Sequence, residues 1–560
     1  MRPWLLAVAT GSVVALAQSG RQRLLLSQAK HPSLAGHAGL ARRVAGMIPY
    51  HGYDASRMFC VDQAPPPIAE LRRDGFFRLA QLYAAKFEKT NALTAATAPA
   101  LSDLQFTSGY RVPFQFRDLV REHLPVGGFL AAGSAATVTD LDGNMFHDLT
   151  GSYGVNLLGY DVYKSCIARG AERVAELGPV LGAYHPVVAE NVTRLRALSG
   201  LDEVSFHMSG TEAVMQAVRL ARYHTGRPRI VRFCGAYHGW WDDVQPGIGN
   251  PTLPGRTLTL AEMSERTLRV LRQRRDIACV LVNPLQALHP NRAAPADGAL
   301  LDSSRGAGVD RDAYTRWLRA LRAVCYARGI VLILDEVFTG FRLARGGAAA
   351  YFDVQPDLVT YGKTLGGGLP VGVLCGRAAV MKRFRDDRPV DVCLARGTFN
   401  AHPYVMGAMA AFLDHLDQPA TAALYQDLDR LWDARASALN GRLHDAMLPV
   451  RVANLSSIWT VCYSVPSRYN WMLQYYLRAA GIALSWVGTG RLIFSLNTND
   501  DAFEAISVRF IQACRAMQAD GWWWTGGTSN RSLRRQVLRE MLMTRLEVLR
   551  IRARPSPAKQ

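Results

Sequence analysis

Short apolar runs rich in β-branched residues alternate with longer stretches of helical spacing between about residue 165 and residue 400. The runs are RIVRF (229–233), ACVLVN (278–283), IVLILDEV (330–337) and LVTYG (358–362). Such alternation is typical of a parallel sheet whose faces are covered by helices. The sequence therefore predicts an α/β fold with a large domain built on a mostly parallel sheet.

Weaker patterns flank this region. Residues 125–151 predict short strands around an Asp-Gly turn at 142–143, and residues beyond 430 predict a helix (430–445) and then a strand (491–497), which together suggest a smaller α+β domain. Residues 65–90 begin with prolines and continue with helical spacing. The expected division is an apolar N-terminal segment (1–30), a mainly helical extension (31–120), the first part of the small domain (121–165), the large domain (166–430), the second part of the small domain (431–520), and a Trp-rich turn with a basic amphipathic tail helix (521–560).

Most of the positive charge lies at the two ends of the chain. The formal net charge is +19, yet residues 1–45 hold six Lys or Arg and no acid, and residues 531–560 hold nine against two acids. The middle of the chain is therefore only mildly basic, and nothing in it resembles a specific nucleic-acid reader. Nine scattered cysteines without a CxxC pair indicate neither disulfides nor a metal site, so we expect no metal and a cytoplasmic location.

Both termini leave alternatives open. Residues 3–17 are apolar and resemble a signal peptide, but they fall short of the ~20 residues that span a bilayer, and the basic flank after them favours the cytoplasm. A membrane-associating helix, a signal peptide and a helix buried against the protein are the three interpretations. The tail (532–554) repeats apolar residues every three to four positions with arginines over the other face. It either lies on an anionic membrane, takes an acidic partner, or docks on its own protein. The apolar positions of the tail are Leu533, Val537, Met541, Leu542, Leu546 and Leu549.

Three polar features fall where a parallel sheet gathers its functional groups. Asp335 lies near the end of one predicted strand, and Lys363 follows the end of the next. The carboxyl ends of parallel strands meet at one edge of a sheet. A third feature, the turn Ser209-Gly210-Thr211, follows another strand and opens a helix, where free N–H groups and the helix dipole favour a phosphate.

Together these groups ask for one ligand, pyridoxal 5'-phosphate. Lysine can bond its aldehyde covalently, a carboxylate can keep its pyridine nitrogen protonated, and the turn can hold its phosphate. Once released, Lys363 can move protons as a general base, particularly if burial lowers its pKa.

Five motifs, in order along the chain, carry a family resemblance. They are SGTEAVMQAVRLAR, FCGAYHGWWDD, LDEVFTGFR, YGKTLGGGLPVG and RGTFNAHP. Over residues 110–515 the chain resembles class III pyridoxal-phosphate-dependent aminotransferases of fold type I. It is similar to glutamate-1-semialdehyde aminomutases and to the aminotransferase domains attached to polyketide synthases.

The resemblance implies roles for individual residues. Lys363 would bond the cofactor, Asp335 would pair with its ring nitrogen, and Val337 and Tyr237 would pack on its two faces. His238 would stand nearby, and Ser209, Gly210 and Thr211 would hold the phosphate. Thr398 would reach the neighbouring subunit's cofactor, which implies a homodimer with shared active sites. The alternatives are a helix N-cap for Asp335, a solvated loop position for Lys363, core positions for Tyr237 and His238, and an ordinary turn for Thr398.

Departures from the family pattern concern the substrate. Asn283 stands where many relatives carry an acid, and a later acid is missing. Arg491 either clamps a substrate carboxylate or is a surface arginine. Ser152 and Tyr153 lie where relatives line the substrate pocket, with a plain turn as the alternative, and Glu336 receives no role.

Three functions follow from this resemblance. The main one is transfer of an amino group between a small-molecule donor and a keto or aldehyde acceptor, free or carrier-bound. The alternatives are an intramolecular aminomutase and a catalytically idle membrane-associated scaffold, the latter disfavoured by the intact lysine and aspartate. Membrane contact through the termini, at the inner face, remains a hypothesis.

Overall fold

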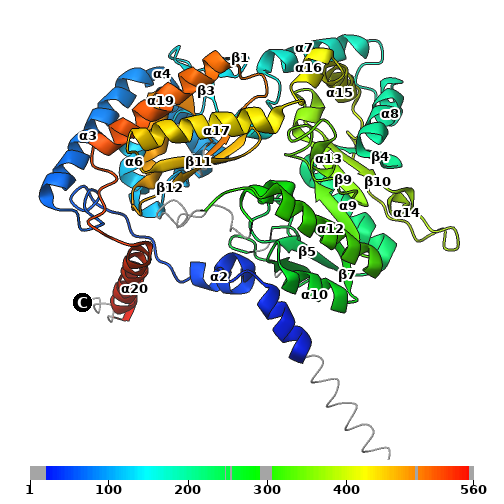
Figure 1. Ribbon diagram of the computed structural model, residues 1–560, viewed down its shortest axis with the longest axis horizontal. Coiled ribbons are helices and arrows are strands. Elements are labelled where there is room, and N and C mark those ends of the chain that lie inside the picture. Colours follow the sequence, from blue (N-terminus) through cyan, green and yellow to red (C-terminus); the bar gives the residue numbers. More distant parts are fainter. Residues whose placement is uncertain (1–19, 246, 253–254, 291–305, 486–489, 554–560) are drawn as a thin grey trace, which may run out of the picture.

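The computed structural model describes residues 20–245, 247–252, 255–290, 306–485 and 490–553, and Figure 1 shows their arrangement. The apolar stretch 3–17 lies outside the described residues. The described chain starts with a helix over 20–29, which projects from the body of the molecule (Figure 1). This helix is mostly exposed, but Ala29 at its end is fully buried and its carbonyl accepts a hydrogen bond from Ala261 N.

A seven-stranded sheet forms the centre of the large domain. Its strand order is β4-β10-β9-β8-β7-β5-β6. The pairs β5–β6, β5–β7, β7–β8 and β8–β9 are parallel, whereas β10 runs antiparallel to β4 and β9. The predicted mostly parallel sheet is confirmed. The strands are β4 (Glu203–His207), β5 (Arg229–Phe233), β6 (Thr257–Leu260), β7 (Ile277–Val282), β8 (Val331–Asp335), β9 (Leu358–Gly362) and β10 (Gly372–Gly376).

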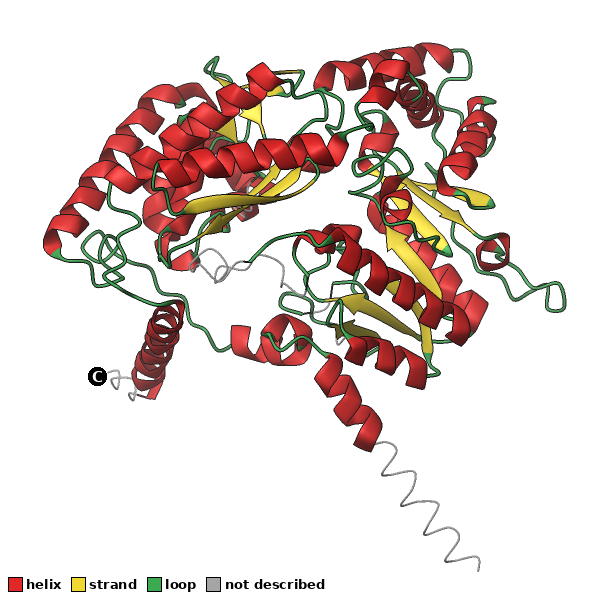
Figure 2. Cartoon of the chain, viewed as in Figure 1, coloured by secondary structure: helices red, strands yellow, loops and turns green. Residues whose placement is uncertain are grey.

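The central strands are buried along their whole length. Every residue of β7, β8 and β9 is buried, because helices cover both faces of the sheet (Figure 2). This explains why these strands appear in the sequence as continuous apolar runs rather than as alternating patterns. The helices of this domain are α7 (Tyr160–Arg173), α8 (Val187–Ser199), α9 (Gly210–Thr225), α10 (Glu265–Gln273), α12 (Arg311–Arg328), α13 (Gly347–Tyr351), α14 (Ala378–Met381) and α15 (Pro403–Leu416).

The small domain joins the two ends of the aminotransferase-like region. The predicted Asp-Gly turn at 142–143 links β2 to β3, which pair antiparallel. β13, from the far end of the chain, pairs parallel with β3 and so completes a four-stranded sheet. Its elements are β1 (Ala132–Ser134), β2 (Thr137–Thr139), β3 (Met145–Asp148), β11 (Val450–Leu455), β12 (Ile458–Tyr463), β13 (Ile482–Ala483), β14 (Arg491–Ile493), α17 (Leu428–Asp445), α18 (Leu473–Ala479) and α19 (Asp500–Ala519).

The strand predicted over 491–497 is too long. β14 ends at Ile493, because the backbone beyond it turns to other partners. Phe494 N donates to Ser457 O at 3.0 Å, and Leu496 N donates to Leu157 O at 2.8 Å. Both acceptors lie outside the sheet, so apolar residues continue past the end of the ladder.

The N-terminal extension consists mainly of helices that pack on the small domain. Arg72, which is fully buried, pairs with Asp62 at 2.8 Å and donates to Gly521 O at 3.0 Å. Tyr83 donates to Tyr475 O at 2.9 Å. The domain boundaries given above stay predictions. The helices are α2 (Ala38–Ala45), α3 (Pro66–Lys86), α4 (Glu88–Thr97), α5 (Ser102–Gly109) and α6 (Arg117–His123).

The tail helix, α20 (Asn530–Ala553), does not have the simple apolar face that its sequence predicts. Leu533 is buried and Val537 packs on the core, whereas Leu542, Leu546 and Leu549 are exposed. The apolar positions are therefore divided between two faces of the helix. Across the described residues, no helix combines the length and apolarity needed to cross a bilayer.

Candidate active site

Asp335 and Lys363 lie at the same edge of the sheet. Asp335 is the last residue of β8 and Lys363 follows the last residue of the adjacent parallel strand β9. The Asp335 side chain is 4% exposed. It accepts hydrogen bonds from His238 Nδ1 at 2.8 Å, Thr360 Oγ1 at 3.2 Å and Val337 N at 3.2 Å. These three donors fix the position of the carboxylate.

Lys363 carries an amine that is easy to deprotonate. Its pKa is lowered to about 8, chiefly because the amino group is buried. The Asp335 carboxylate opposes this shift, and the guanidiniums of Arg491 and Arg342 reinforce it. The Nζ atom also lies 4.5 Å from the centre of the Phe338 ring. A lysine with a pKa near 8 exists in both protonation states around neutral pH, as proton transfer requires.

His238 lies beside Asp335, and it is also a core residue. It is 1% exposed, and burial lowers the pKa of its imidazole. The donor to the Asp335 carboxylate is Nδ1–H. Within the described part of the chain, Nε2 has no hydrogen-bond partner although it is buried. The ring therefore positions the carboxylate as a neutral group.

Three segments converge where the sequence predicts a phosphate. Ser209 caps α9 through Oγ, which accepts from Glu212 N at 3.3 Å, so the N–H groups of Gly210 and Thr211 in the first turn remain for a ligand. A Cβ on Gly210 would lie 2.5 Å from Val337 Cγ1. A Cβ on Gly239, which has a φ of +92°, would lie 2.5 Å from Thr211 Oγ1. Only glycine fits these two close approaches, and the resulting cradle suits the phosphate of pyridoxal phosphate.

Tyr237 and Thr398 are both exposed. Tyr237 is 60% exposed, which excludes the core alternative for this residue. Its carbonyl accepts from Asn283 Nδ2 at 2.9 Å, so Asn283 supports the loop that carries Tyr237 and His238. Thr398 lies in an exposed turn before α15. Its predicted reach into a neighbouring subunit stays a prediction.

The loop η4 (Gly151–Gly154) borders the lysine. A Cβ on Gly154 would lie 3.5 Å from Lys363 Cδ. Ser152 and Tyr153 have φ values of 44° and 57°, a strained conformation that is common at functional sites. Ser152 Oγ shares a 2.6 Å hydrogen bond with Tyr160, and Tyr153 is 56% exposed. Because this loop adjoins Lys363, these residues lie beside the candidate site.

Arg491 lies within electrostatic range of Lys363. A surface location remote from the site is therefore excluded. The structure thus groups Arg491 with the loop η4 around the lysine, and its assignment to substrate binding stays a prediction.

Two residues of the LDEVFTGFR motif belong to the site, although no role was predicted for them. Phe338 faces the Lys363 amine, as described above. Arg342 is 1% exposed and donates to Phe494 O at 2.7 Å and Asn156 O at 3.3 Å, which ties the large domain to the loop after η4. In the sequence, only the motif indicates that these two residues belong to the site. The backbone acceptors of Arg342 lie more than a hundred residues away along the chain.

Glu336 has a structural function, which agrees with its lack of an assigned role. Its carboxylate accepts from Ala348 N and, at 2.8 Å, from Ala349 N, and so caps α13. Burial raises the pKa of Glu336 to about 7.

The potential metal ligands, the cysteines and one surface pocket concern parts of the molecule outside the site. In the described residues, no group of three or more His, Cys, Asp or Glu side chains could hold a metal ion. All nine cysteines are free thiols.

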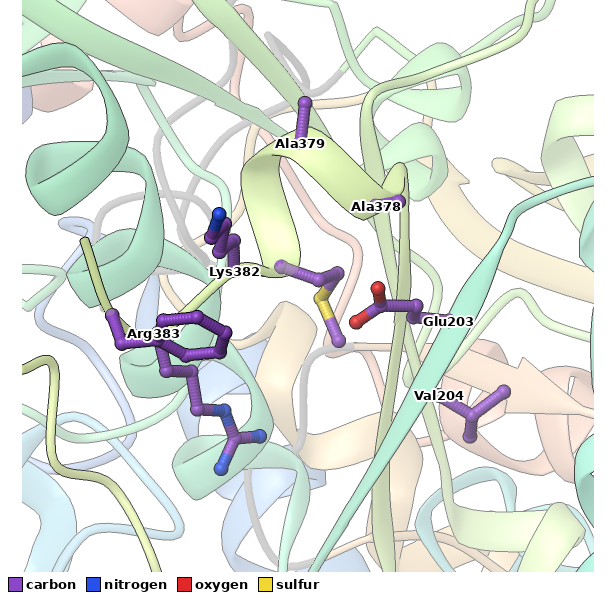
Figure 3. Close-up of a pocket in the computed structure, with 8 residues that line it drawn as sticks. Glu203, Val204, Ala378, Ala379, Lys382 and Arg383 are labelled. Atoms are coloured by element: carbon purple, nitrogen blue, oxygen red, sulfur yellow. The ribbon is translucent and has the colours of Figure 1, made fainter. Parts of the chain in front are cut away.

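The pocket in Figure 3 is lined by Glu203, Val204, Ala378, Ala379, Lys382 and Arg383. Glu203 pairs with Gly376 and Gly376 with Leu358, the first residue of β9, so this pocket opens at the edge of the sheet opposite Lys363.

Known proteins resemble the chain in sequence. A glutamate-1-semialdehyde 2,1-aminomutase from Anaeromyxobacter sp. (strain Fw109-5) is 34% identical over 366 residues, which cover 62% of this chain and 79% of that protein. The protein of the same name from Myxococcus xanthus (strain DK1622) is 32% identical over 383 residues, covering 64% and 82%.

Solved structures resemble it in fold. A transaminase with bound PLP superposes with a TM-score of 0.61 at 27% identity, covering 78% of this chain and 99% of that one. A glutamate-1-semialdehyde aminomutase from Pseudomonas aeruginosa PAO1 gives a TM-score of 0.64 at 18% identity, with coverage of 80% and 99%. At 18% identity, the similarity to the Pseudomonas aeruginosa structure shows a shared fold and no more.

The family model of class-III aminotransferases matches residues 121–513. The match takes in the sheet edge with Asp335 and Lys363, the α9 cradle and the loop η4. The chain therefore belongs to the class-III aminotransferases, enzymes whose cofactor is pyridoxal 5'-phosphate.

Proposed function

We propose that this class-III aminotransferase acts through Lys363 and Asp335 on a small-molecule amino donor and a keto or aldehyde acceptor. The observation that carries the assignment is the placement of both residues at the ends of adjacent parallel strands, next to the α9 cradle. The amine with a pKa near 8 and the fixed carboxylate are the two groups that amino transfer requires.

Different residues of the chain would carry out different parts of the amino transfer. When bound, pyridoxal phosphate supplies a reactive aldehyde and a ring that accepts electrons. Gly210 and Thr211 would hold its phosphate, and Asp335 would hold its ring nitrogen. His238 keeps the carboxylate in place. Lys363 Nζ would hold the cofactor through its aldehyde and, as a free amine, would take and return a proton on the substrate carbon.

Arg491 and the loop η4 are proposed to receive the substrate. The electrostatic influence of Arg491 on Lys363 supports this part of the proposal, because guanidiniums bind carboxylates through paired hydrogen bonds. Ser152 and Tyr153 adjoin the same space. An extended or carrier-bound acceptor belongs to the same proposal, and the 56% exposed side chain of Tyr153 would be available to contact it.

An aminomutase is the second candidate. The two sequence relatives described above carry that name, at 34% and 32% identity. A transaminase needs a separate donor, whereas an aminomutase keeps its intermediate within a closed site. A screen of amino donors against pyruvate and longer keto or aldehyde acceptors, followed through the cofactor's absorbance, distinguishes the two. Turnover that requires a separate donor supports transamination.

Borohydride reduction tests the lysine assignment. The reagent fixes pyridoxal phosphate to the amine that holds it, and peptide mass spectrometry then locates the modified residue. We expect the label on Lys363 and its loss in Lys363→Ala. Label on another lysine, or an unchanged visible absorbance in the variant, contradicts the assignment. The same result decides against the idle-scaffold alternative, since a scaffold needs no covalent cofactor.

A homodimer with shared active sites is the third part of the proposal. Large apolar side chains are concentrated in the exposed segment that precedes α15, where Thr398 lies. Val390 is 91% exposed and Leu394 75% exposed, and side chains of this size seldom face water in such a cluster unless a partner covers them. The two aspartate variants Val390→Asp and Leu394→Asp should dissociate the dimer in analytical ultracentrifugation. A monomeric native protein contradicts this part.

The proposed location is the cytoplasm, with peripheral contact at the inner face of the membrane through the two termini. The basic residues of both ends support this location, because anionic lipids attract such segments. Fractionation of cells that make the native chain tests it. Recovery of all protein in the soluble fraction at low salt contradicts membrane contact.

A further inference from the structure

Helix α20 is fixed to the body of the protein through one face. Leu533 is 2% exposed, and Val537 packs on the core. Glu540 accepts hydrogen bonds from Arg57 at 3.1 Å and from Arg468 at 3.3 Å, and its side chain is only 11% exposed. An acid of the helix is thereby used to hold it in place.

The opposite face of α20 is apolar and uncovered. Leu538, Leu542, Leu546 and Leu549 are 60%, 61%, 48% and 47% exposed. Their spacing of four, four and three residues places them on one side of the helix, which we call the outer face. A single exposed leucine is ordinary, but four in a row form a continuous stripe that water solvates poorly.

Arginines share this side of the helix. Residues 530–553 contain seven arginines and two acids. Helical periodicity puts Arg535 and Arg539 next to Leu542, seven and three residues before it. The outer face is therefore apolar and basic together, unlike the face of an ordinary solvated helix.

We propose that the outer face of α20 docks on an anionic lipid bilayer. Leucines on such a helix enter the boundary between headgroups and acyl chains, and arginine stems bury while their guanidiniums reach lipid phosphates. This inference rests on the proposed peripheral location and adds the docking surface and the lipid chemistry.

A second element favours a membrane over an acidic protein partner. The helix over 20–29 projects from the same side of the molecule as α20 (Figure 1). It carries Arg21, Arg23 and the 60% exposed Leu24. Stable peripheral binding commonly takes two weak anchors, and these two helices extend from one side of the molecule.

The test compares full-length variants by sedimentation with vesicles of phosphatidylcholine, with and without phosphatidylserine. The outer-face variant is Leu542→Glu with Leu546→Glu. Its matched control is Leu82→Glu with Leu93→Glu, on α3 and α4, where both leucines are 43% exposed. We expect the native chain and the control to bind phosphatidylserine vesicles, and the outer-face variant to bind at least tenfold more weakly. Arg535→Gln with Arg539→Gln should remove the preference for phosphatidylserine. Cofactor absorbance checks that each variant is folded.

Each other outcome decides against the inference. If the native chain ignores phosphatidylserine vesicles, both the location and the docking surface are wrong. If the native chain binds and the outer-face variant binds equally well, the surface is wrong while the location stands. If the variant instead changes the mass of the protein assembly without affecting vesicle binding, the outer face is a protein interface.

Discussion

Replacing Arg342 with methionine tests whether a buried guanidinium holds the large domain to the loop after η4. Arg342 donates to the carbonyls of Phe494 at 2.7 Å, Asn156 at 3.3 Å and Gly154 at 3.4 Å, and to Ser457 Oγ at 3.2 Å. Methionine fills much of the same volume and donates nothing. The substitution therefore leaves buried acceptors unpaired.

Two opposing effects set the size of the change. A buried carbonyl without a donor costs about 1–3 kcal/mol. Three carbonyls lose their donor, and because two of these hydrogen bonds are long, the total loss is about 5 kcal/mol. Burial lowers the pKa of Arg342 to about 10, so removing this charge relieves about 3 kcal/mol at 1.36 kcal/mol per pKa unit. The loss of hydrogen bonds is larger than the relief from removing the buried charge, so we expect a net destabilisation of about 2 kcal/mol.

Urea titration of the cofactor-free protein measures this difference. Arg345→Met is the matched control, since Arg345 is 49% exposed and pairs with Asp417 at the surface. Such pairs contribute about 0–1 kcal/mol, so the control should change the urea midpoint little. If Arg342→Met lowers the midpoint no more than Arg345→Met, the inferred tie between the domains is wrong. Because the Arg342 charge also lowers the pKa of Lys363, the variant should raise that pKa.

Three further predictions concern single groups of the fold. Lys363 in the cofactor-free protein should react with an acylating reagent with a midpoint near pH 8, and Asp335→Asn should lower that midpoint because the carboxylate favours the charged amine. Gly210→Ala should weaken pyridoxal phosphate binding at least tenfold in equilibrium dialysis, since its Cβ would lie 2.5 Å from Val337 Cγ1. Burial raises the pKa of Glu262 to about 8, above its unfolded value of 4.5, so stability should fall as the pH rises from 4.5 to 8. Glu262→Gln should remove this part of the pH dependence of the urea midpoint.

Each of these three predictions has a control or a result that would contradict it. Gly39→Ala, at a position with no atom within 4 Å of the added Cβ, should leave cofactor binding unchanged. An equal effect at both glycines would show that the cradle is not the binding site. A reaction midpoint for Lys363 near that of free lysine would contradict the burial of its amine. A Glu262→Gln protein with the pH profile of the native chain would show that Glu262 is already ionised in the fold.

Local patterns determined the large sheet and the pair of residues at its edge. Continuous apolar runs predicted β5, β7, β8 and β9, because strands buried on both faces have no polar side. Asp335 and Lys363 could be brought together from sequence, since neighbouring parallel strands end at the same edge. The end of β14 could not, because the chain leaves the ladder for the carbonyls of Ser457 and Leu157, one of them far away in sequence.

The sequence by itself determined the family and its cofactor, because motif spacing along one chain encodes them. Only the tertiary structure decided that Phe338 faces the lysine amine, that Arg342 and Arg491 lie within electrostatic range of it, and that α20 buries Leu533 while exposing Leu542. The physical reason is that periodicity shows which residues share a face, whereas packing between distant segments decides which face meets protein and which meets solvent.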